Sequence, residues 1–207
     1  ILQAFIDGFT KKAARGLDVM AFHGLNPKTK TESSIIGTNA FDKNTGVATV
    51  TAISGDADGT IEALASAIGD YNLTGLALSK TYASELAKMT VNGVKMYPEL
   101  GWGANPDSVN GVPVDVNTTV SVAKSGVTGD LAIGGDFQNA FKWGFADEIP
   151  LEVIPYGDPD NTGKDLKGHN QVYLRGEAYI GWGILQLLRL LDPQLNFRGG
   201  YDVQIPK

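Results

Sequence analysis

Two histidines, His23 and His169, are the first side chains to consider for chemistry in this 207-residue chain. A metal or catalytic site built on them would require the fold to bring both rings together with carboxylates. His23 lies at the end of a helical pattern, where the helix dipole favours an imidazolium, and His169 lies in a polar loop. We therefore predict surface or capping roles for both histidines, with no metal site and no catalytic site.

Three short segments rich in Asp and Gly have some features of ion-binding or phosphate-binding turns. The segment at Asp56 and the loop 158–163 lack the twelve-residue calcium loop with its terminal bidentate Glu. Turn and capping roles are commoner for Asp and Asn in such positions. Gly134, Gly135 and Asp136 do not match a glycine-rich phosphate loop, and Asp136 would repel a phosphate. No cofactor is predicted.

Carboxylate and hydroxyl groups give no better candidate for catalysis. Asp147 and Glu148 could be proposed as an acid–base pair, but neighbouring side chains of a strand point to opposite faces. Ser108 and Ser125 lack the G-x-S-x-G sequence of a hydrolase nucleophile. The sequence therefore predicts a protein that is not an enzyme.

Composition narrows the remaining classes. Hydrophobic residues make up 43% of the chain, which is enough for a sizeable core. The net charge of −6 argues against a mainly electrostatic nucleic-acid binder. The absence of cysteine excludes disulfides and thiolate metal sites. No apolar run approaches the roughly 20 residues that cross a bilayer, so no membrane partner is predicted. Because Ile1 lies inside a helical pattern, we expect a longer parent chain.

Periodicity predicts a helical and mixed α/β first part. Residues 1–22 have apolar side chains at helical spacing, and 47–90 alternate between strand and helix patterns. Ser79 is a good N-cap candidate. The other predicted features of this part are a strand at 47–53, a helix after Asp56, a strand at 73–78, Asn-Gly turns at 92–93 and 110–111, and short strands at 112–116 and 131–133.

Beyond Phe137 the pattern changes to a period of two. Alternation across 171–184 predicts a strand of about 45 Å, longer than the usual 3–10 residues. Such ribbons extend beyond a compact core and often meet neighbouring molecules. The tryptophans, with Tyr173 and Tyr179, could form a sugar platform, but strand aromatics more often serve packing and subunit contacts.

Four short motifs in a fixed order resemble one known family. The chain is similar to the C-terminal two-thirds of a major capsid protein of a tailed double-stranded-DNA phage or prophage, of the Hong Kong 97 type. The resemblance covers nearly all 207 residues. The motifs are Tyr-Pro-Glu-Leu at 97–100, Val-Asn-Gly-Val-Pro-Val at 109–114, Asp-Leu-Ala-Ile-Gly-Gly-Asp-Phe at 130–137 and Val-Tyr-Leu-Arg-Gly-Glu-Ala at 172–178.

The resemblance implies an α+β fold with three parts. Residues 1–53 would hold the long spine helix and the first strands of a peripheral domain. Residues 54–135 would form a mixed α/β axial domain, which gathers around fivefold and sixfold axes. Residues 136–207 would supply the long antiparallel strands of the peripheral domain and a C-terminal segment. The family's N-terminal arm and extended loop would precede Ile1.

The implied function is that of a structural shell subunit of the virion, assembled in the host bacterial cytoplasm. Pentamers and hexamers would form an icosahedral head around DNA that is only weakly contacted, with a scaffold protein and a portal as further partners. The candidate subunit-contact residues are Arg175, Glu177, Glu152, Trp143 and Trp182.

Two alternatives stay open at this point. An encapsulin-like compartment shell resembles the same fold. A carbohydrate-active β-rich enzyme using Asp and Glu would need a concave pocket with two carboxylates roughly 5–10 Å apart.

Overall fold

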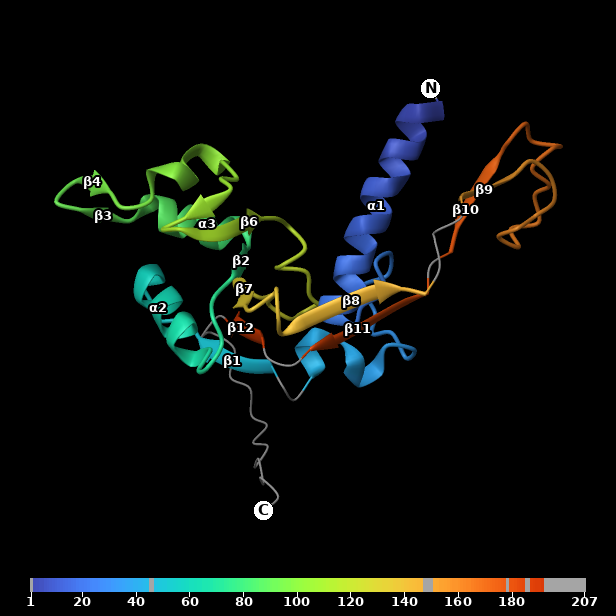
Figure 1. Cartoon of the computed structure of the whole chain (residues 1–207). Coiled ribbons are helices and arrows are strands. Elements are labelled where there is room, and N and C mark those ends of the chain that lie inside the picture. Colours follow the sequence, from blue (N-terminus) through green and yellow to red (C-terminus); the bar gives the residue numbers. More distant parts are fainter. Residues whose placement is uncertain (1, 45–46, 147–150, 178, 185–186, 192–207) are drawn as a thin grey trace, which may run out of the picture. The chain divides into compact units, whose positions relative to one another are not determined.

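The computed structural model of the chain describes residues 2–44, 47–146, 151–177, 179–184 and 187–191 (Figure 1). Two compact units are present: residues 1–141 with 184–207, called the body here, and residues 142–183, called the ribbon unit. Among the described helices, none combines the length and hydropathy needed to cross a bilayer.

A six-stranded mixed sheet forms the centre of the body. Its order is β1-β12-β7-β2-β6-β5. β1 and β12 pair in parallel, as do β2 and β6, whereas β7 is antiparallel to both of its neighbours, and β5 is antiparallel to β6. The strands are β1 (Val47–Thr51), β2 (Gly75–Leu78), β5 (Ser108–Val109), β6 (Val112–Val116), β7 (Ala132–Gly135) and β12 (Leu187–Leu191).

Two capped helices, α2 (Ala57–Ala67) and α3 (Lys80–Lys88), pack with this sheet. The side chain of Asp56 accepts a hydrogen bond from the amide of Gly59, and that of Ser79 accepts one from the amide of Tyr82. Both residues are therefore N-caps, as predicted. Gly134 of β7 allows close packing, because a Cβ there would lie 2.6 Å from Leu64 Cδ2. The fully buried core members include Leu64, Leu78, Tyr82, Leu86 and Leu100.

The long helix α1 (Leu2–His23) confirms the predicted first helix. Phe22 near its end contacts Phe41 and Phe141, with ring centroids 5.2 and 5.8 Å apart. Phe41 belongs to the short 3-10 helix η2 (Phe41–Lys43), which follows η1 (Gly37–Asn39). The apolar stripe predicted along α1 is only partly buried, since Phe5 is 62% exposed.

Both predicted Asn-Gly turns close hairpins. Asn92 and Gly93 join β3 (Thr90–Val91) to β4 (Val94–Lys95), and Asn110 and Gly111 join β5 to β6. All four turn residues have φ between 49° and 81°, as the tight turns of hairpins require. The 3-10 segment η3 (Pro98–Gly103) follows β4.

The ribbon unit corrects the prediction of one long strand over 171–184. Two separate strands occupy that segment, and each pairs with a different partner: β10 (Tyr173–Gly176) with β9 (Leu151–Ile154), and β11 (Ile180–Ile184) with β8 (Phe141–Phe145). Gly176 ends β10, and glycine weakens strands because it loses more entropy on ordering. Asp147 and Glu148, considered above as a pair, lie outside the described residues.

Sheet membership crosses the predicted domain boundaries at 53 and 135. β1 and β12 come from segments assigned to the peripheral domain, yet they share a sheet with β7 and β2. The division into axial and peripheral domains stays a prediction, because it refers to symmetry axes that a single chain does not contain. Residues 192–207 of the predicted C-terminal segment lie outside the described residues.

Candidate functional site

Three of the five predicted contact residues form one charged group in the ribbon unit. Arg175 of β10 lies directly opposite Glu152 of β9, with Nη1 and Oε2 4.0 Å apart. The second terminal nitrogen of the guanidinium, Nη2, pairs with Glu177 Oε1. All three side chains are more than half exposed, at 52%, 62% and 53%. Exposed pairs of this kind add only about 0–1 kcal/mol to the stability of one chain.

The two predicted tryptophans differ in exposure. Trp143 of β8 is 61% exposed and meets the Phe145 ring edge to face, with centroids 5.1 Å apart. Trp182 of β11 is half-buried. Trp143 and Phe145 are two residues apart in one strand, so they lie on the same face. The pair forms an exposed aromatic surface on β8.

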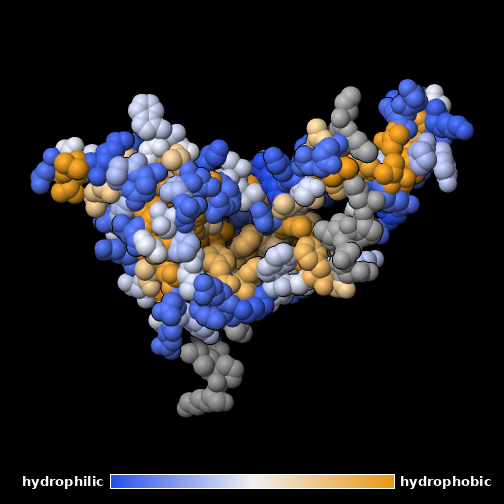
Figure 2. Space-filling model, turned by 45° about the horizontal axis from the view of Figure 1, so that its top comes forward, coloured by the Kyte–Doolittle hydropathy of each residue, from blue (hydrophilic) through white to orange (hydrophobic). Residues whose placement is uncertain are grey.

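The ribbon unit has almost no core of its own. Among its described residues, Leu166 is the one buried hydrophobic residue. Isolated two-stranded ribbons are at best marginally stable in water. Hydrophobic residues on its surface are visible in orange in Figure 2. Besides Trp143 and Phe145, the large exposed hydrophobic side chains are Val153, Tyr156, Val172, Tyr173 and Tyr179.

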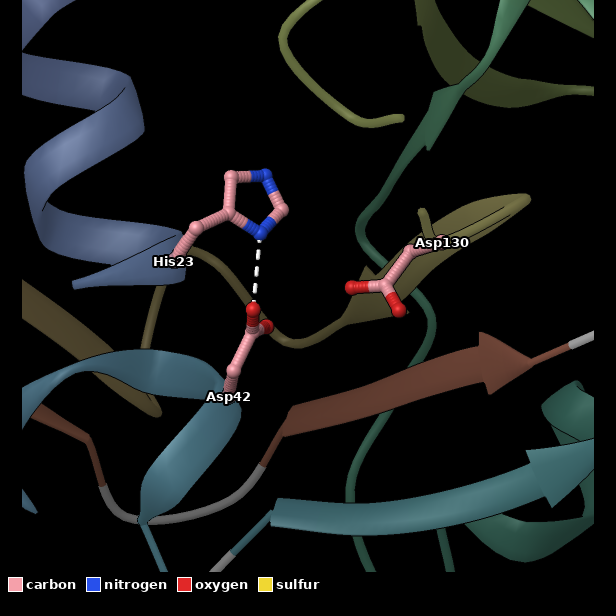
Figure 3. Close-up of side chains that lie close together, drawn as sticks. All are labelled: His23, Asp42 and Asp130. Atoms are coloured by element: carbon pink, nitrogen blue, oxygen red, sulfur yellow. Dashed lines mark hydrogen bonds and ion pairs between the residues drawn. The ribbon is translucent and has the colours of Figure 1, made fainter. Parts of the chain in front are cut away.

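His23 is buried, which corrects the predicted surface position. Its Nδ1 lies 2.7 Å from Asp42 Oδ2, and its Nε2 lies 2.8 Å from the carbonyl oxygen of Thr119. A carbonyl and an ionised carboxylate only accept hydrogen bonds, so both ring nitrogens must carry hydrogen. Figure 3 shows the carboxylate of Asp130 beside this pair. The geometry is that of an imidazolium that donates to acceptors on two segments, Asp42 and Thr119, with the carboxylate of Asp130 nearby.

Electrostatics agrees with this geometry. Burial alone would lower the pKa of His23, but the hydrogen bond and charge of Asp42, the charge of Asp130 and the Thr119 carbonyl together raise it. One ligand atom each from His23, Asp42 and Asp130 lies within 4.8 Å of the others, a spacing that a metal could use. Because both imidazole nitrogens already donate, the ring offers no lone pair to a metal. We call the group formed by His23, Asp42, Asp130 and the Thr119 carbonyl the His23 clamp.

A small pocket adjoins the His23 clamp. Its volume is about 200 Å³, and Phe22, Ile133 and Phe137 form much of its apolar wall, with Asp18 and Asp115 also lining it. Burial and repulsion from Asp115 raise the pKa of Asp18, although His23 opposes the shift. The volume is below the roughly 300–1,000 Å³ of typical ligand sites. This pocket does not favour the carbohydrate-active alternative.

The remaining polar candidates have local structural roles. His169 is exposed, and its Nδ1 lies 2.9 Å from the carbonyl oxygen of Asp165. Asp136 accepts hydrogen bonds from the backbone of Gln138 and Asn139, which confirms a turn cap. Asp158 likewise accepts from backbone amides of its loop, at 3.0 and 2.6 Å.

Comparisons with solved structures find chains of similar fold. A chain of Mycobacterium phage Ogopogo is 31% identical with a TM-score of 0.78, covering 93% of this chain and 68% of that chain. A chain of Gordonia phage Cozz is 26% identical with a TM-score of 0.74, covering 93% and 63%. The capsid of a native GTA particle, computed with C5 symmetry, shares the fold at 16% identity and a TM-score of 0.58.

No family model and no curated protein matches the chain. The chain spans about two-thirds of the length of the phage chains that it resembles.

The fold and these relatives define the class: a shell-forming structural protein with the α+β fold of the Hong Kong 97 type. The chain belongs to the family of phage major capsid proteins and is a component of the virion. The predicted family, fold class and shell role are thereby confirmed. The compartment and carbohydrate-enzyme alternatives are not favoured. The five contact residues stay a prediction.

Proposed function

We propose that the complete gene product builds an icosahedral phage head from pentamers and hexamers and encloses double-stranded DNA. The observation that carries this proposal is the 31% identity to a phage chain over 93% of the present chain. Closed symmetric assembly lets many weak contacts act together. The protein acts through geometry and catalyses no reaction.

Other components complete the proposal. A scaffold protein and a portal take part in assembly, which takes place in the cytoplasm of the host bacterium. The net charge of −6 keeps the contact with packaged DNA weak. Residues 54–135 serve as the axial domain, and strands β1 and β12 extend the sheet of that domain. The ribbon unit belongs to the peripheral domain.

We further propose that the ribbon unit is where neighbouring subunits meet. Its surface carries the aromatic pair Trp143–Phe145, and tryptophan is prominent among residues that dominate interface energies. Arg175 supplies a planar group with several donors, which suits carboxylates of a neighbour as well as Glu152 and Glu177. Trp182 lies on β11, the strand that pairs with β8. A neighbour would cover apolar surface that one chain leaves in water.

The test of shell formation is direct. We expect the complete gene product to form large particles in electron microscopy and to sediment rapidly, with nuclease-resistant DNA in infected cells. Small species alone, with every segment of the gene product present, would contradict the proposal. Particles that hold a cargo enzyme, from a gene without portal and terminase neighbours, would instead support the compartment alternative.

The contact proposal has its own test. Arg175→Glu reverses a charge between two carboxylates and should raise the concentration needed for assembly by about tenfold. Lys124→Glu makes the same charge change at an exposed site with no proposed contact, and it should assemble normally. Equal behaviour of the two variants would remove Arg175 from the interface.

A further inference from the structure

Trp102 has an unusual combination of backbone and exposure. Its φ and ψ are 61° and 21°, in the left-handed region, and its side chain is fully exposed. A bulky residue with positive φ is an outlier, because its Cβ crowds the backbone. Such conformations persist where the surroundings impose them, and they gather at functional positions. Nothing in the described part of the chain covers the indole.

The turn that carries Trp102 is firmly held. Leu100 is buried, and the Tyr97 hydroxyl donates a hydrogen bond to Asp58 at the start of α2. Pro98 fixes the first residue of η3. The amide of Ala104 then donates to the carbonyl of Gly101 at 3.2 Å, closing the turn around Trp102. The backbone that carries the indole is therefore already held before any contact forms, which limits the ordering of the turn on binding.

The β3–β4 hairpin, which precedes this turn in the sequence, has no side chain buried against the rest of the described chain. Every residue from 90 to 96 is exposed. Val91 and Val94 lie opposite each other across the ladder, and they are 54% and 70% exposed. Met96 is also exposed, at 37%. Figure 2 shows this hairpin as an orange tip. A two-stranded hairpin with both faces in water is marginal by itself.

These two features hold most of the large exposed hydrophobic side chains among the described residues of this part of the body. Among the described residues of 54–135, six large hydrophobic side chains are exposed, and four of them lie between 91 and 102. The other two, Tyr71 and Val127, stand apart in the sequence. Clustered exposure of this kind marks an interaction surface.

We propose that Trp102 of one copy packs on the Val91–Val94–Met96 surface of the β3–β4 hairpin of the next copy. This inference rests on the proposed shell-forming function, which brings further copies of the same chain alongside. The two surfaces differ, so the contact is head-to-tail, and such contacts close into rings when the rotation allows. The hairpin would gain the support that one chain does not provide, and the indole would lie in a water-excluding apolar contact.

A cross-linking experiment tests the pairing. The chain contains no cysteine, so Trp102→Cys and Val94→Cys can each be made alone in the complete gene product and the two variants co-assembled. A short bismaleimide is preferable to oxidation, because packed side chains hold their Cα atoms farther apart than disulfide geometry allows. We expect cross-linked dimers of mixed composition. Particles of Trp102→Cys alone should give none.

Substitution gives a second readout. Trp102→Gly removes the indole and also suits the left-handed backbone. We expect its free subunit to unfold at a temperature no lower than the wild type, while the concentration needed for assembly rises by about tenfold or more. Ile35→Ala is the control, because Ile35 is 93% exposed in the body but lies outside the proposed contact.

The outcomes separate this inference from the proposed function. Wild-type protein that forms no particles would contradict shell formation itself. Wild-type particles without mixed cross-links, together with normal assembly of Trp102→Gly, would overturn only the Trp102 contact. Cross-linking of Trp102→Cys to itself would show a symmetric contact and overturn the head-to-tail pairing.

Discussion

The body and the ribbon unit differ in how many large apolar side chains each buries within its own chain segment. The body buries Leu64, Tyr82 and Phe41 completely between helices and strands of the same chain. In the ribbon unit, Leu166 is the one buried hydrophobic residue among those described, and aromatic side chains such as Trp143 lie in water. Burial of apolar side chains within one chain therefore stabilises the body far more than the ribbon unit, and the proposed subunit contacts would cover the aromatic side chains that the ribbon unit leaves in water.

The largest effect on the free subunit should come from the core of the body. Leu64→Ala leaves a cavity beneath Gly134 and should lower the free energy of unfolding by about 3–5 kcal/mol. Chemical denaturation of the purified subunit measures this loss. The matched change Val153→Ala, at a residue of the ribbon unit that is 54% exposed, should stay within about 0.5 kcal/mol. Equal losses would show that Val153 contributes as much to the folded subunit as Leu64.

A second large effect should follow from removing the His23 clamp. His23→Gln leaves the carboxylates of Asp42 and Asp130 without the charge between them. We expect a loss of about 2–3 kcal/mol, somewhat below the range for fully buried pairs because Asp42 keeps some contact with water. His169→Gln changes an exposed ring and should have little effect. Thermal unfolding at neutral pH distinguishes the two variants.

The His23 clamp also predicts a pH dependence. The pKa of His23 is raised in the folded protein above its usual value of 6.5. Between the unfolded and folded pKa values the folded state binds more protons, so stability should fall as the pH rises through this window. The stabilisation should be fully present below the unfolded pKa. Unfolding curves of wild type and His23→Gln should converge on the alkaline side. Parallel curves would contradict an imidazolium clamp.

The smallest effect on the free subunit should come from the ribbon unit, where assembly is the sensitive measurement. Trp143→Ala should change the unfolding free energy by no more than about 0.5 kcal/mol. The same variant should assemble at least about tenfold less readily, because it lacks an exposed aromatic contact. Light scattering at several protein concentrations measures this. A marked loss of subunit stability without any assembly defect would make Trp143 an internal packing residue.

Local signals in the sequence were sufficient for much of the fold. The Ser79 cap and the Asn-Gly turns at 92–93 and 110–111 depend only on residues nearby in the sequence. A short segment was therefore enough to predict each of them. The alternation through 171–184 predicted strand correctly but not its interruption, because alternation continues whether or not a partner strand is present. The motifs shared with capsid proteins indicated the family because their order reflects the whole chain.

Long-range features escaped prediction for a physical reason. The His23 clamp joins residues 23, 42, 119 and 130, which no local pattern connects. The exposure of Trp102 depends on a left-handed turn that hydrophobic patterning does not encode. A glycine on each side of Trp102 was the available signal, since Gly-Trp-Gly allows an unusual backbone.

The position of β12 has a consequence for synthesis. β12 lies between β1 and β7, although about 140 residues separate β1 from β12 in the chain. A nascent chain that has not reached Leu187 leaves β1 without its ladder partner and β7 with an open edge. The sheet can therefore close only late in translation, after the other described helices and strands of the chain have been synthesised. A chain truncated before Leu187 would leave β1 and β7 with unpaired backbone groups along one edge each, and it should aggregate.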